Sequence, residues 1–400
     1  MALTSWFRRG RPVLAAALAL GIAGCATTPR IPYTQAEANT AIVDGDPLLR
    51  TWANNPDPQF FAKTQGVQAV LNRAGQRTTY LALSGGGGDG AFGAGVLNGW
   101  SESGTRPDFS IVSGVSTGAL IAPFAFLGPN YDGVIKDIYT SGAAETLLES
   151  PDLFGALFGP AVFSNDRLRN LVTRYVTPEI IAEIGQERDR GRLLYVVTTN
   201  LDQQRAVLWD MGAIARQGTP RAVELFRTIL IASAAIPAIF PPVFIDATGA
   251  NGRPFQELHV DGTVTSPVYT LPRSYLVHRA DLPGARGGTL FVLMNSKIEP
   301  DFQVVNNVTT EIGARTFSTF VRNQARTDLT LAQNVARDSG MAFKIAAIDR
   351  NFPDQRGVGF DTAYMRRLYQ YGYEQARTGQ FWQTSIPGDL RSPRQNVAQR

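Results

Sequence analysis

A glycine-rich stretch between two apolar segments constrains the fold of this chain more than any other feature. Residues 84–95, SGGGGDGAFGAG, hold seven glycines in twelve positions. The apolar run TYLALS at residues 79–84 precedes them and indicates a buried strand, and residues 91–103 follow with apolar side chains at helical spacing. Glycine in a regular element costs roughly 0.5–1 kcal/mol relative to alanine, so this cluster indicates a backbone that approaches something closely or adopts positive φ angles.

The same alternation of strand and helix continues along the chain. Further strands are expected at residues 108–115, 192–202, 205–211, 255–262 and 289–296, and helices at residues 165–176, 178–190, 221–235 and 307–338. Strands that alternate with helices predict an α/β fold whose mainly parallel sheet is covered by helices on both faces. After about residue 300 we expect a long helix, a strand at residues 341–349 and an aromatic-rich helix at residues 362–379.

The N-terminal segment is predicted to be a targeting signal rather than part of the fold. Arg8, Arg9 and Arg11 form a basic start, and the apolar run at residues 13–23 is too short to span a bilayer. The segment ends in Ile-Ala-Gly-Cys, which resembles the lipobox of bacterial lipoproteins and implies that Cys25 is lipidated and becomes the mature N-terminus. The alternative is an ordinary secretory signal followed by an incidental cysteine. Cys25 is the only cysteine, so the chain cannot form an internal disulfide.

These features divide the chain into four expected parts. Residues 1–24 form the signal peptide, residues 25–77 a lipidated tether and N-terminal extension, residues 78–300 the main α/β domain, and residues 301–400 a helical C-terminal extension with a frayed tail. Removal of the signal takes away three arginines and no acidic residue, so the formal net charge falls from +4 to +1. Nucleic-acid binding needs a basic surface on the mature domain, so this charge argues against a nucleic-acid partner.

Residues 114–118, Gly-Val-Ser-Thr-Gly, match the pattern G-x-S-x-G of a nucleophile elbow. An apolar strand precedes the motif and an apolar helix follows it, which is the setting that such an elbow requires. Gly114 and Gly118 leave room for a sharp turn, and the N-terminus of the helix supports negative charge beside Ser116. Ser116 is therefore the candidate nucleophile. A serine hydroxyl is a weak nucleophile until a base accepts its proton.

Two side chains are candidates for this base. Asp261 follows an expected strand in ELHVDGTVTSP, and a carboxylate with a reference pKa near 3.9 can accept the hydroxyl proton if it contacts Ser116. An aspartate before a glycine is otherwise a common turn former. His278 is the alternative, since the order Ser116, Asp261, His278 is that of an α/β-hydrolase triad. His259 would face the same side of the strand as Asp261, and we interpret it as a buried structural histidine.

Three motifs taken together resemble those of the patatin-like phospholipase family. The glycine loop at residues 85–90 matches the family's G-x-G-x-x-G motif, residues 114–118 match its G-x-S-x-G elbow, and Asp261 with Gly262 matches its D-G motif. The run ASAAIPAIFPP at residues 232–242 is similar to the family's small-residue segment before the aspartate strand. The motifs also occur in the family's order, and the resemblance covers roughly residues 80–300.

This resemblance implies a three-layer α/β/α sandwich and hydrolysis of lipid acyl esters, such as phospholipid or lysophospholipid, through an acyl-enzyme. Ser116 would be the nucleophile and Asp261 the proton acceptor of a Ser-Asp dyad. The backbone amides of Gly86, Gly87 and Gly88 would form the oxyanion hole. The chemistry implied requires no metal ion and no cofactor.

Two positions depart from the family's pattern. Asp89 stands where the family usually has arginine or lysine, and Thr263 where it usually has alanine or glycine. A carboxylate directed at the oxyanion would raise the barrier that the glycine loop is meant to lower. We therefore expect Asp89 to point away from the site, toward solvent or an arginine. Thr263 is a mild change that adds a β-branched side chain beside the dyad.

Two readings from other classes stay open on the sequence. Nucleotide binding is disfavoured because no GK[ST] follows the glycines and no acidic residue about twenty positions on stands out as a ribose ligand. A non-catalytic lipoprotein is the other alternative, supported mainly by Asp89. Lipidation at Cys25 would hold the chain on the periplasm-facing side of the bacterial cell envelope. Ala26, in place of aspartate, resembles lipoproteins that are released to the outer membrane and favours it over the inner membrane.

Overall fold

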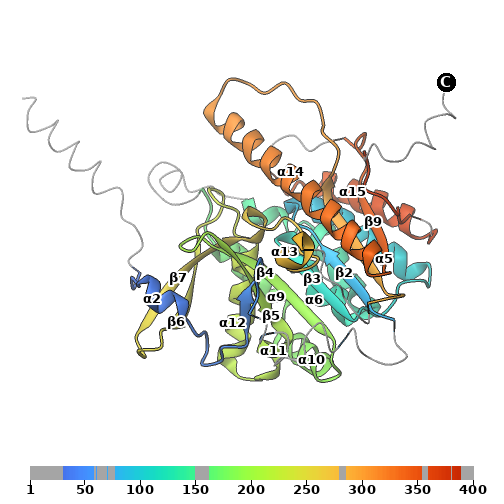
Figure 1. Ribbon diagram of the computed structural model, residues 1–400. Helices are drawn as coiled ribbons and strands as arrows, with labels where there is room; N and C mark the ends of the chain where they lie inside the picture. Colours follow the sequence, from blue (N-terminus) through green and yellow to red (C-terminus); the bar gives the residue numbers. More distant parts are fainter. Residues whose placement is uncertain are drawn as a thin grey trace, which may run out of the picture.

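A nine-stranded sheet lies at the centre of the described residues (Figure 1). The computed structural model describes residues 30–57, 60, 70, 77–148, 162–278, 285–353, 359–379 and 381–388. The order in space is β1-β5-β4-β3-β2-β8-β9, while β7 pairs with β4 and with β6. The strands are β1 (Arg50–Trp52), β2 (Thr79–Leu83), β3 (Ile111–Val115), β4 (Leu193–Asn200), β5 (Arg205–Asp210), β6 (Val243–Thr248), β7 (Pro254–Asp261), β8 (Thr289–Lys297) and β9 (Ala342–Ile348).

The middle of the sheet is parallel. Neighbouring strands β4, β3, β2, β8 and β9 run in the same direction. The antiparallel pairings involve β1, β5, β6 and β7. The sequences TYLAL, IVSGV and LLYVVTTN are buried along almost their whole length. Runs of this kind suit a parallel sheet, because helices cover both of its faces.

Helices form a layer on each face of the sheet. Side chains that alternate along β2 divide between two hydrophobic cores: Leu81 and Leu83 pack in the first, Tyr80 and Ala82 in the second. The first core takes side chains from α5 (Gly90–Glu102), α6 (Thr117–Leu127), α7 (Asp132–Thr140), α9 (Asp166–Tyr175), α10 (Pro178–Asp189), α11 (Met211–Arg216), α12 (Pro220–Ser233) and α15 (Thr362–Ala376). The second takes them from α13 (Arg273–Val277) and α14 (Thr309–Asp338). A short helix, α2 (Gln35–Asn39), precedes β1.

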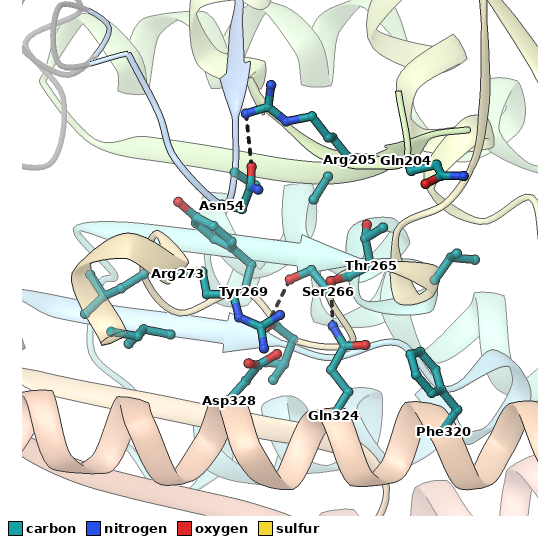
Figure 2. Close-up of a pocket in the computed structure, with 16 residues that line it drawn as sticks. Asn54, Gln204, Arg205, Thr265, Ser266, Tyr269, Arg273, Phe320, Gln324 and Asp328 are labelled. Carbon is teal, nitrogen blue, oxygen red and sulfur yellow. Dashed lines mark hydrogen bonds between the residues drawn. The ribbon is translucent and has the colours of Figure 1, made fainter. Parts of the chain in front are cut away.

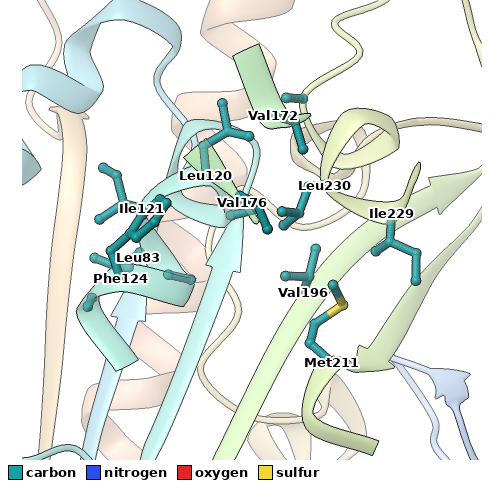
Figure 3. Close-up of a cluster of buried hydrophobic side chains, with 14 of the residues drawn as sticks. Leu83, Leu120, Ile121, Phe124, Val172, Val176, Val196, Met211, Ile229 and Leu230 are labelled. Carbon is teal, nitrogen blue, oxygen red and sulfur yellow. The ribbon is translucent and has the colours of Figure 1, made fainter. Parts of the chain in front are cut away.

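The first core fixes the region where β3 ends and α6 begins. Figure 3 shows side chains of one buried cluster from the sheet and from two helices: Leu83 and Val196 from the sheet, Leu120, Ile121 and Phe124 from α6, and Ile229 and Leu230 from α12. All of these side chains are buried. This packing holds α6 against the sheet where β3 ends.

The predicted fold class is confirmed. The structure has a mainly parallel central sheet between two helical layers, and helices α14 and α15 supply the expected helical C-terminal region. The sheet nevertheless extends beyond residues 78–300 at both ends. At one edge β1 pairs with β5, and at the other β9 pairs with β8. Segments of the expected N-terminal and C-terminal extensions are thus edge strands of the main sheet.

The C-terminal helix α15 packs closely against α5. A Cβ atom added to Gly95 would lie 2.0 Å from the carbonyl oxygen of Tyr369, and one added to Gly372 would lie 2.6 Å from that of Phe92. Only glycine permits such close approach of two helix backbones. Because α5 begins directly after the glycine loop, α15 supports the element that positions this loop.

The N-terminal signal expected at residues 1–24, together with Cys25, lies outside the described residues. Within the described part of the chain, no helix combines the length and the apolar character needed to cross a membrane.

Candidate active site

Ser116 occupies a strained turn between β3 and α6. Its φ of 55° and ψ of −125° are rare for a residue with a side chain, and such strain is a feature of nucleophile elbows. The turn is tight: a Cβ atom on Gly118 would lie 2.5 Å from the carbonyl oxygen of Leu83. Ser116 stands directly before the first turn of α6, where the helix dipole favours negative charge.

Strand register brings Asp261 next to Ser116. Val115, the last residue of β3, pairs with Val197 of β4. Where β3 ends, β7 takes its place beside β4, and Asp261 pairs with Thr198, the next residue along. The residue that follows Val115 is Ser116, so the two side chains meet. The Ser116 Oγ donates a hydrogen bond of 2.6 Å to Asp261 Oδ2.

The carboxylate of Asp261 is fully buried and held at both oxygens. The backbone N–H and the hydroxyl of Thr263 each donate a hydrogen bond of 2.8 Å to Oδ1. Burial raises the pKa of Asp261 to about 6, while the hydrogen bonds from Ser116 and Thr263 act in the opposite direction. Such a carboxylate is ionised at neutral pH and can take up a proton during a reaction.

The small-residue run at residues 232–242 holds the backbone on both sides of this pair. Ser233 Oγ accepts a hydrogen bond of 3.0 Å from the Ser116 amide and donates one of 2.7 Å to the Val197 carbonyl. The carbonyl of Ala235 accepts one of 2.9 Å from the Asp261 amide. The sequence analysis identified this run by its small residues, but no pattern in the run indicated that Ser233 contacts the nucleophile.

The glycine loop lies directly over the dyad. A Cβ atom on Gly85 would lie 2.1 Å from Thr263 Cγ2 and 3.1 Å from Ser116 Cβ. The amide of Gly85 donates to the carbonyl of Pro267, and that of Asp89 donates to Gly86. Three amides lie between these two positions, those of Gly86, Gly87 and Gly88. None of them donates a hydrogen bond to an acceptor among the described residues.

Asp89 contacts the C-terminal helix. Its Oδ1 accepts a hydrogen bond of 2.8 Å from the hydroxyl of Tyr364 in α15. The same segment approaches the loop a second time, since a Cβ atom on Gly88 would lie 2.7 Å from the carbonyl oxygen of Gly359. No pattern in the sequence indicated that residues of the C-terminal part contact the loop.

Neither histidine joins the dyad in the structure. His278 is exposed at the end of α13, and among the described residues no hydrogen bond connects it to Ser116 or Asp261. His259 is fully buried, with Nδ1 2.9 Å from Thr198 Oγ1 and Nε2 3.1 Å from Glu257 Oε2. Burial lowers the pKa of His259, which favours the neutral ring.

A small apolar pocket opens beside Ser116. Its wall comes from the glycine loop, from α6 and α9, from the segment after α12, and from Phe360 just before α15. The lining residues are Gly87, Ser116, Thr117, Leu120, Leu147, Leu168, Ala234, Ile236, Phe240 and Phe360. Apart from Ser116 and Thr117 these side chains offer only carbon surface, which suits a hydrocarbon group.

Part of the chain matches a known protein family. The family described as patatin-like phospholipase matches residues 81–272, which hold the glycine loop, the elbow and the Asp-Gly motif. Among solved structures, the crystal structure of VipD from Legionella pneumophila aligns with 78% of this chain and 68% of its own, at 15% identity and a TM-score of 0.41. No curated protein matches the chain significantly. Residues 81–272 form a domain of the patatin-like phospholipase family, and the chain is a lipid acyl hydrolase.

Proposed function

We propose that the chain hydrolyses acyl esters of phospholipids or lysophospholipids with a Ser116–Asp261 dyad. The observation that carries this proposal is the 2.6 Å hydrogen bond from Ser116 Oγ to Asp261 Oδ2. It links the candidate nucleophile to a base without a histidine between them. The strained elbow at Ser116 and the unengaged amides of the glycine loop support the same chemistry.

The reaction proceeds in two halves. As Ser116 Oγ bonds to the ester carbonyl carbon, its proton passes to Asp261 and the carbonyl oxygen becomes an oxyanion. When the bond to the alcohol oxygen breaks, Asp261 returns this proton to the leaving alcohol and an acyl-enzyme remains. Water then attacks the acyl carbon and gives a proton to Asp261. The bond from this carbon to Ser116 Oγ breaks, Asp261 returns the proton to Oγ, and the fatty acid is released.

The glycine loop stabilises the oxyanion in this scheme. The amides of Gly86, Gly87 and Gly88 are the donors, and the N-terminus of α6 adds its dipole at the same place. Loss of one donor from such a hole typically costs about 3–4 kcal/mol of transition-state stabilisation. The apolar pocket beside Ser116, bounded by Phe240 and Phe360, takes the start of the acyl chain.

Serine labelling tests whether the site is catalytic. A fluorophosphonate probe should react with the folded chain, and Ser116→Ala should abolish the reaction. Ser318→Ala, an exposed serine on α14, is the control that should leave labelling intact. Folded protein that fails to label would favour the non-catalytic alternative.

Substitution of His278 distinguishes the dyad from the Ser116-Asp261-His278 triad. The exposure of His278 and the direct contact between Ser116 and Asp261 support the dyad. His278→Gln should retain most of the activity toward a short-chain ester. A triad enzyme would lose orders of magnitude in kcat from the same change.

Lipidation at Cys25 is a separate part of the proposal. The basic start, the apolar run and the Ile-Ala-Gly-Cys sequence support an anchor that holds the enzyme at the periplasm-facing side of the bacterial outer membrane. Expressed in a bacterium, the full chain should incorporate labelled fatty acid and sediment with membranes. Cys25→Ser should do neither. Equal membrane recovery of both forms would contradict a lipid anchor at this residue.

A further inference from the structure

A second pocket lies away from Ser116, between α14 and the segment that follows Asp261. It has a volume of about 290 Å³. One wall is formed by Val264, Thr265 and Ser266, and Ser116 is absent from the lining. Figure 2 shows Asp328 and Gln324 rising from α14 on one side and Arg205 with Asn54 on the other. At about 30 Å³ per water molecule, the space holds a ligand of roughly ten heavy atoms.

Asp328 places a buried carboxylate in the wall of this pocket. It is only 8% exposed, and its Oδ1 atom has no hydrogen-bond partner. Burial raises the pKa of Asp328 to about 6, and the positive charge of Arg273 only partly offsets this effect. A buried carboxylate oxygen without a partner is costly, so a site that keeps one open favours a ligand that donates a hydrogen bond to it.

Two guanidinium groups also line the pocket, and one of them, that of Arg273, interacts electrostatically with the Asp328 carboxylate. Neither Arg205 nor Arg273 forms a salt bridge with a described residue. Arg205 is held by other contacts: its Cζ lies 4.1 Å from the centre of the Trp52 ring, and its Nη2 lies 3.5 Å from Asn54 Oδ1. Arginine binds phosphate oxygens well because its planar group offers several donors in a fixed geometry.

The remaining lining suits a small carbon skeleton with hydroxyl groups. Gln324 and Ser266 present polar atoms, while Tyr269 and Phe320 add aromatic surface. Gln324 is fixed by a hydrogen bond of 2.6 Å to the carbonyl of Thr265.

We propose that this pocket binds a small phosphate ester that also carries a hydroxyl or ammonium group, of the glycerophosphate type. Arg205 and Arg273 bind the phosphate, and the hydroxyl or ammonium group donates a hydrogen bond to Asp328. The ligand is either a free phosphate ester or the headgroup of a phospholipid. The site is independent of the reaction at Ser116, so its test uses protein that cannot turn over substrate.

Calorimetric titration of the chain carrying Ser116→Ala tests the site with two probes, sn-glycerol 3-phosphate and inorganic phosphate. Glycerol 3-phosphate should bind saturably and about tenfold more tightly than inorganic phosphate, because its glycerol hydroxyls can donate to Asp328 while its phosphate stays at the two arginines. Arg205→Gln and Arg273→Gln should weaken the binding of both probes. Asp328→Leu, which has a similar shape but no acceptor, should remove most of the preference for the ester without weakening the binding of inorganic phosphate.

Arg337→Gln is the matched control, since Arg337 is exposed on the same helix and outside the pocket. It should change neither affinity. No saturable binding of the ester, or binding that none of the three pocket variants alters, overturns the proposal. A short-chain phospholipid added as competitor shows which kind of ligand the pocket takes. If it displaces glycerol 3-phosphate, the pocket binds a lipid headgroup; if glycerol 3-phosphate stays bound, the ligand is a free phosphate ester.

Discussion

Asp261 has to satisfy two opposing requirements as a single residue. Its burial raises the pKa and favours the protonated acid, whereas three hydrogen bonds from Ser116 and Thr263 favour the carboxylate. The resulting pKa of about 6 leaves the group ionised at neutral pH. It is also high enough for the carboxylate to accept a proton from serine more readily than an ordinary aspartate does.

The rate of ester hydrolysis should therefore depend on pH through Asp261. We expect kcat/KM to fall below about pH 6, because the protonated acid cannot accept the Ser116 proton. Asp261→Asn should lower kcat by about 10²–10⁴-fold. Rates on a short-chain ester between about pH 4 and 9 measure both effects. A kcat/KM that stays constant down to pH 4 would contradict the role of Asp261.

The protonation of Asp261 should also affect stability, but in the opposite direction: the protonated form that lowers activity stabilises the fold. The pKa of Asp261 is raised from 3.8 to about 6 in the folded chain, so folding favours the bound proton. Its contribution to the free energy of unfolding is therefore fully present below about pH 4 and is lost as the pH rises through about 6. Asp261→Asn should gain stability relative to the unmodified chain between these pH values, as measured by thermal unfolding. An unchanged difference across this range would show that the carboxyl titrates normally.

Asp89 should act on stability rather than on turnover. Its bond to Tyr364 directs the carboxylate to α15, so neutralising the carboxylate replaces a charge-assisted hydrogen bond between the loop and the helix by a weaker neutral one. Asp89→Asn and Tyr364→Phe should each lower the free energy of unfolding by about 1–3 kcal/mol, and the double variant should lose less than the sum. A severalfold rise in the turnover of Asp89→Asn would instead show that the charge faces the oxyanion.

At this scale the sequence identified the two candidate residues of the dyad but not the residues that hold them in place. Ser116 and Asp261 were identifiable because their motifs have a fixed local form, and the structure brings them together. The roles of Ser233 and Tyr364 depend on tertiary contacts across 117 and 275 residues, which no local pattern records. Thr263 was expected to be a mild change, yet it donates two hydrogen bonds to the Asp261 carboxylate.

At the scale of elements, the strands and helices with long or periodic apolar runs could be predicted from the sequence. Strands β2, β3, β4 and β8 and the long helix α14 lie close to the expected ranges, because their apolar runs are long or periodic. No element was expected for β1 or β6. The strand β1 has only three residues, and β6, VFIDAT, is buried only at alternate positions. Both are stabilised by pairing with neighbouring strands rather than by a strong local pattern.

The elbow between β3 and α6 should tolerate no side chain at Gly118. A Cβ atom there would lie 2.5 Å from the Leu83 carbonyl oxygen and 2.6 Å from that of Ser84, and backbone atoms cannot move aside easily. Gly118→Ala should therefore displace the elbow and lower kcat by at least about 10²-fold, or prevent folding. Esterase rates and circular dichroism of the purified variant separate these outcomes.

Gly133 provides the control for this change. It also occupies the second position of a helix, α7, but a Cβ atom there would meet nothing within 4 Å. Gly133→Ala should leave activity unchanged and raise the free energy of unfolding by roughly 0.5–1 kcal/mol. If the two variants had the same activity and stability, the close contacts at Gly118 would not be the reason that the elbow requires glycine.

At the scale of the whole molecule, the motifs span a smaller region than the folded unit. The family match ends at residue 272, whereas the sheet continues through β8 to β9 and the layer of helices is completed by α15. Residues 359–364 reach the glycine loop and the apolar pocket beside Ser116. The expected boundaries at residues 78 and 300 followed the motifs, which mark the chemistry and not the limits of the hydrophobic core.

Residues 78–300 alone should consequently fail to fold into an active enzyme. Their isolation removes β1, β9, α14 and α15, and with them the buried side chains of Leu329, Phe343 and Met365. It also exposes the face of α5 that contacts α15 and leaves β5 and β8 as unpaired edges, which promote aggregation. We expect this fragment to be insoluble or to lack a cooperative thermal transition. The chain from residue 30 to 388 should melt cooperatively and hydrolyse a short-chain ester. A soluble fragment 78–300 with a similar melting temperature and rate would show that the C-terminal part is dispensable.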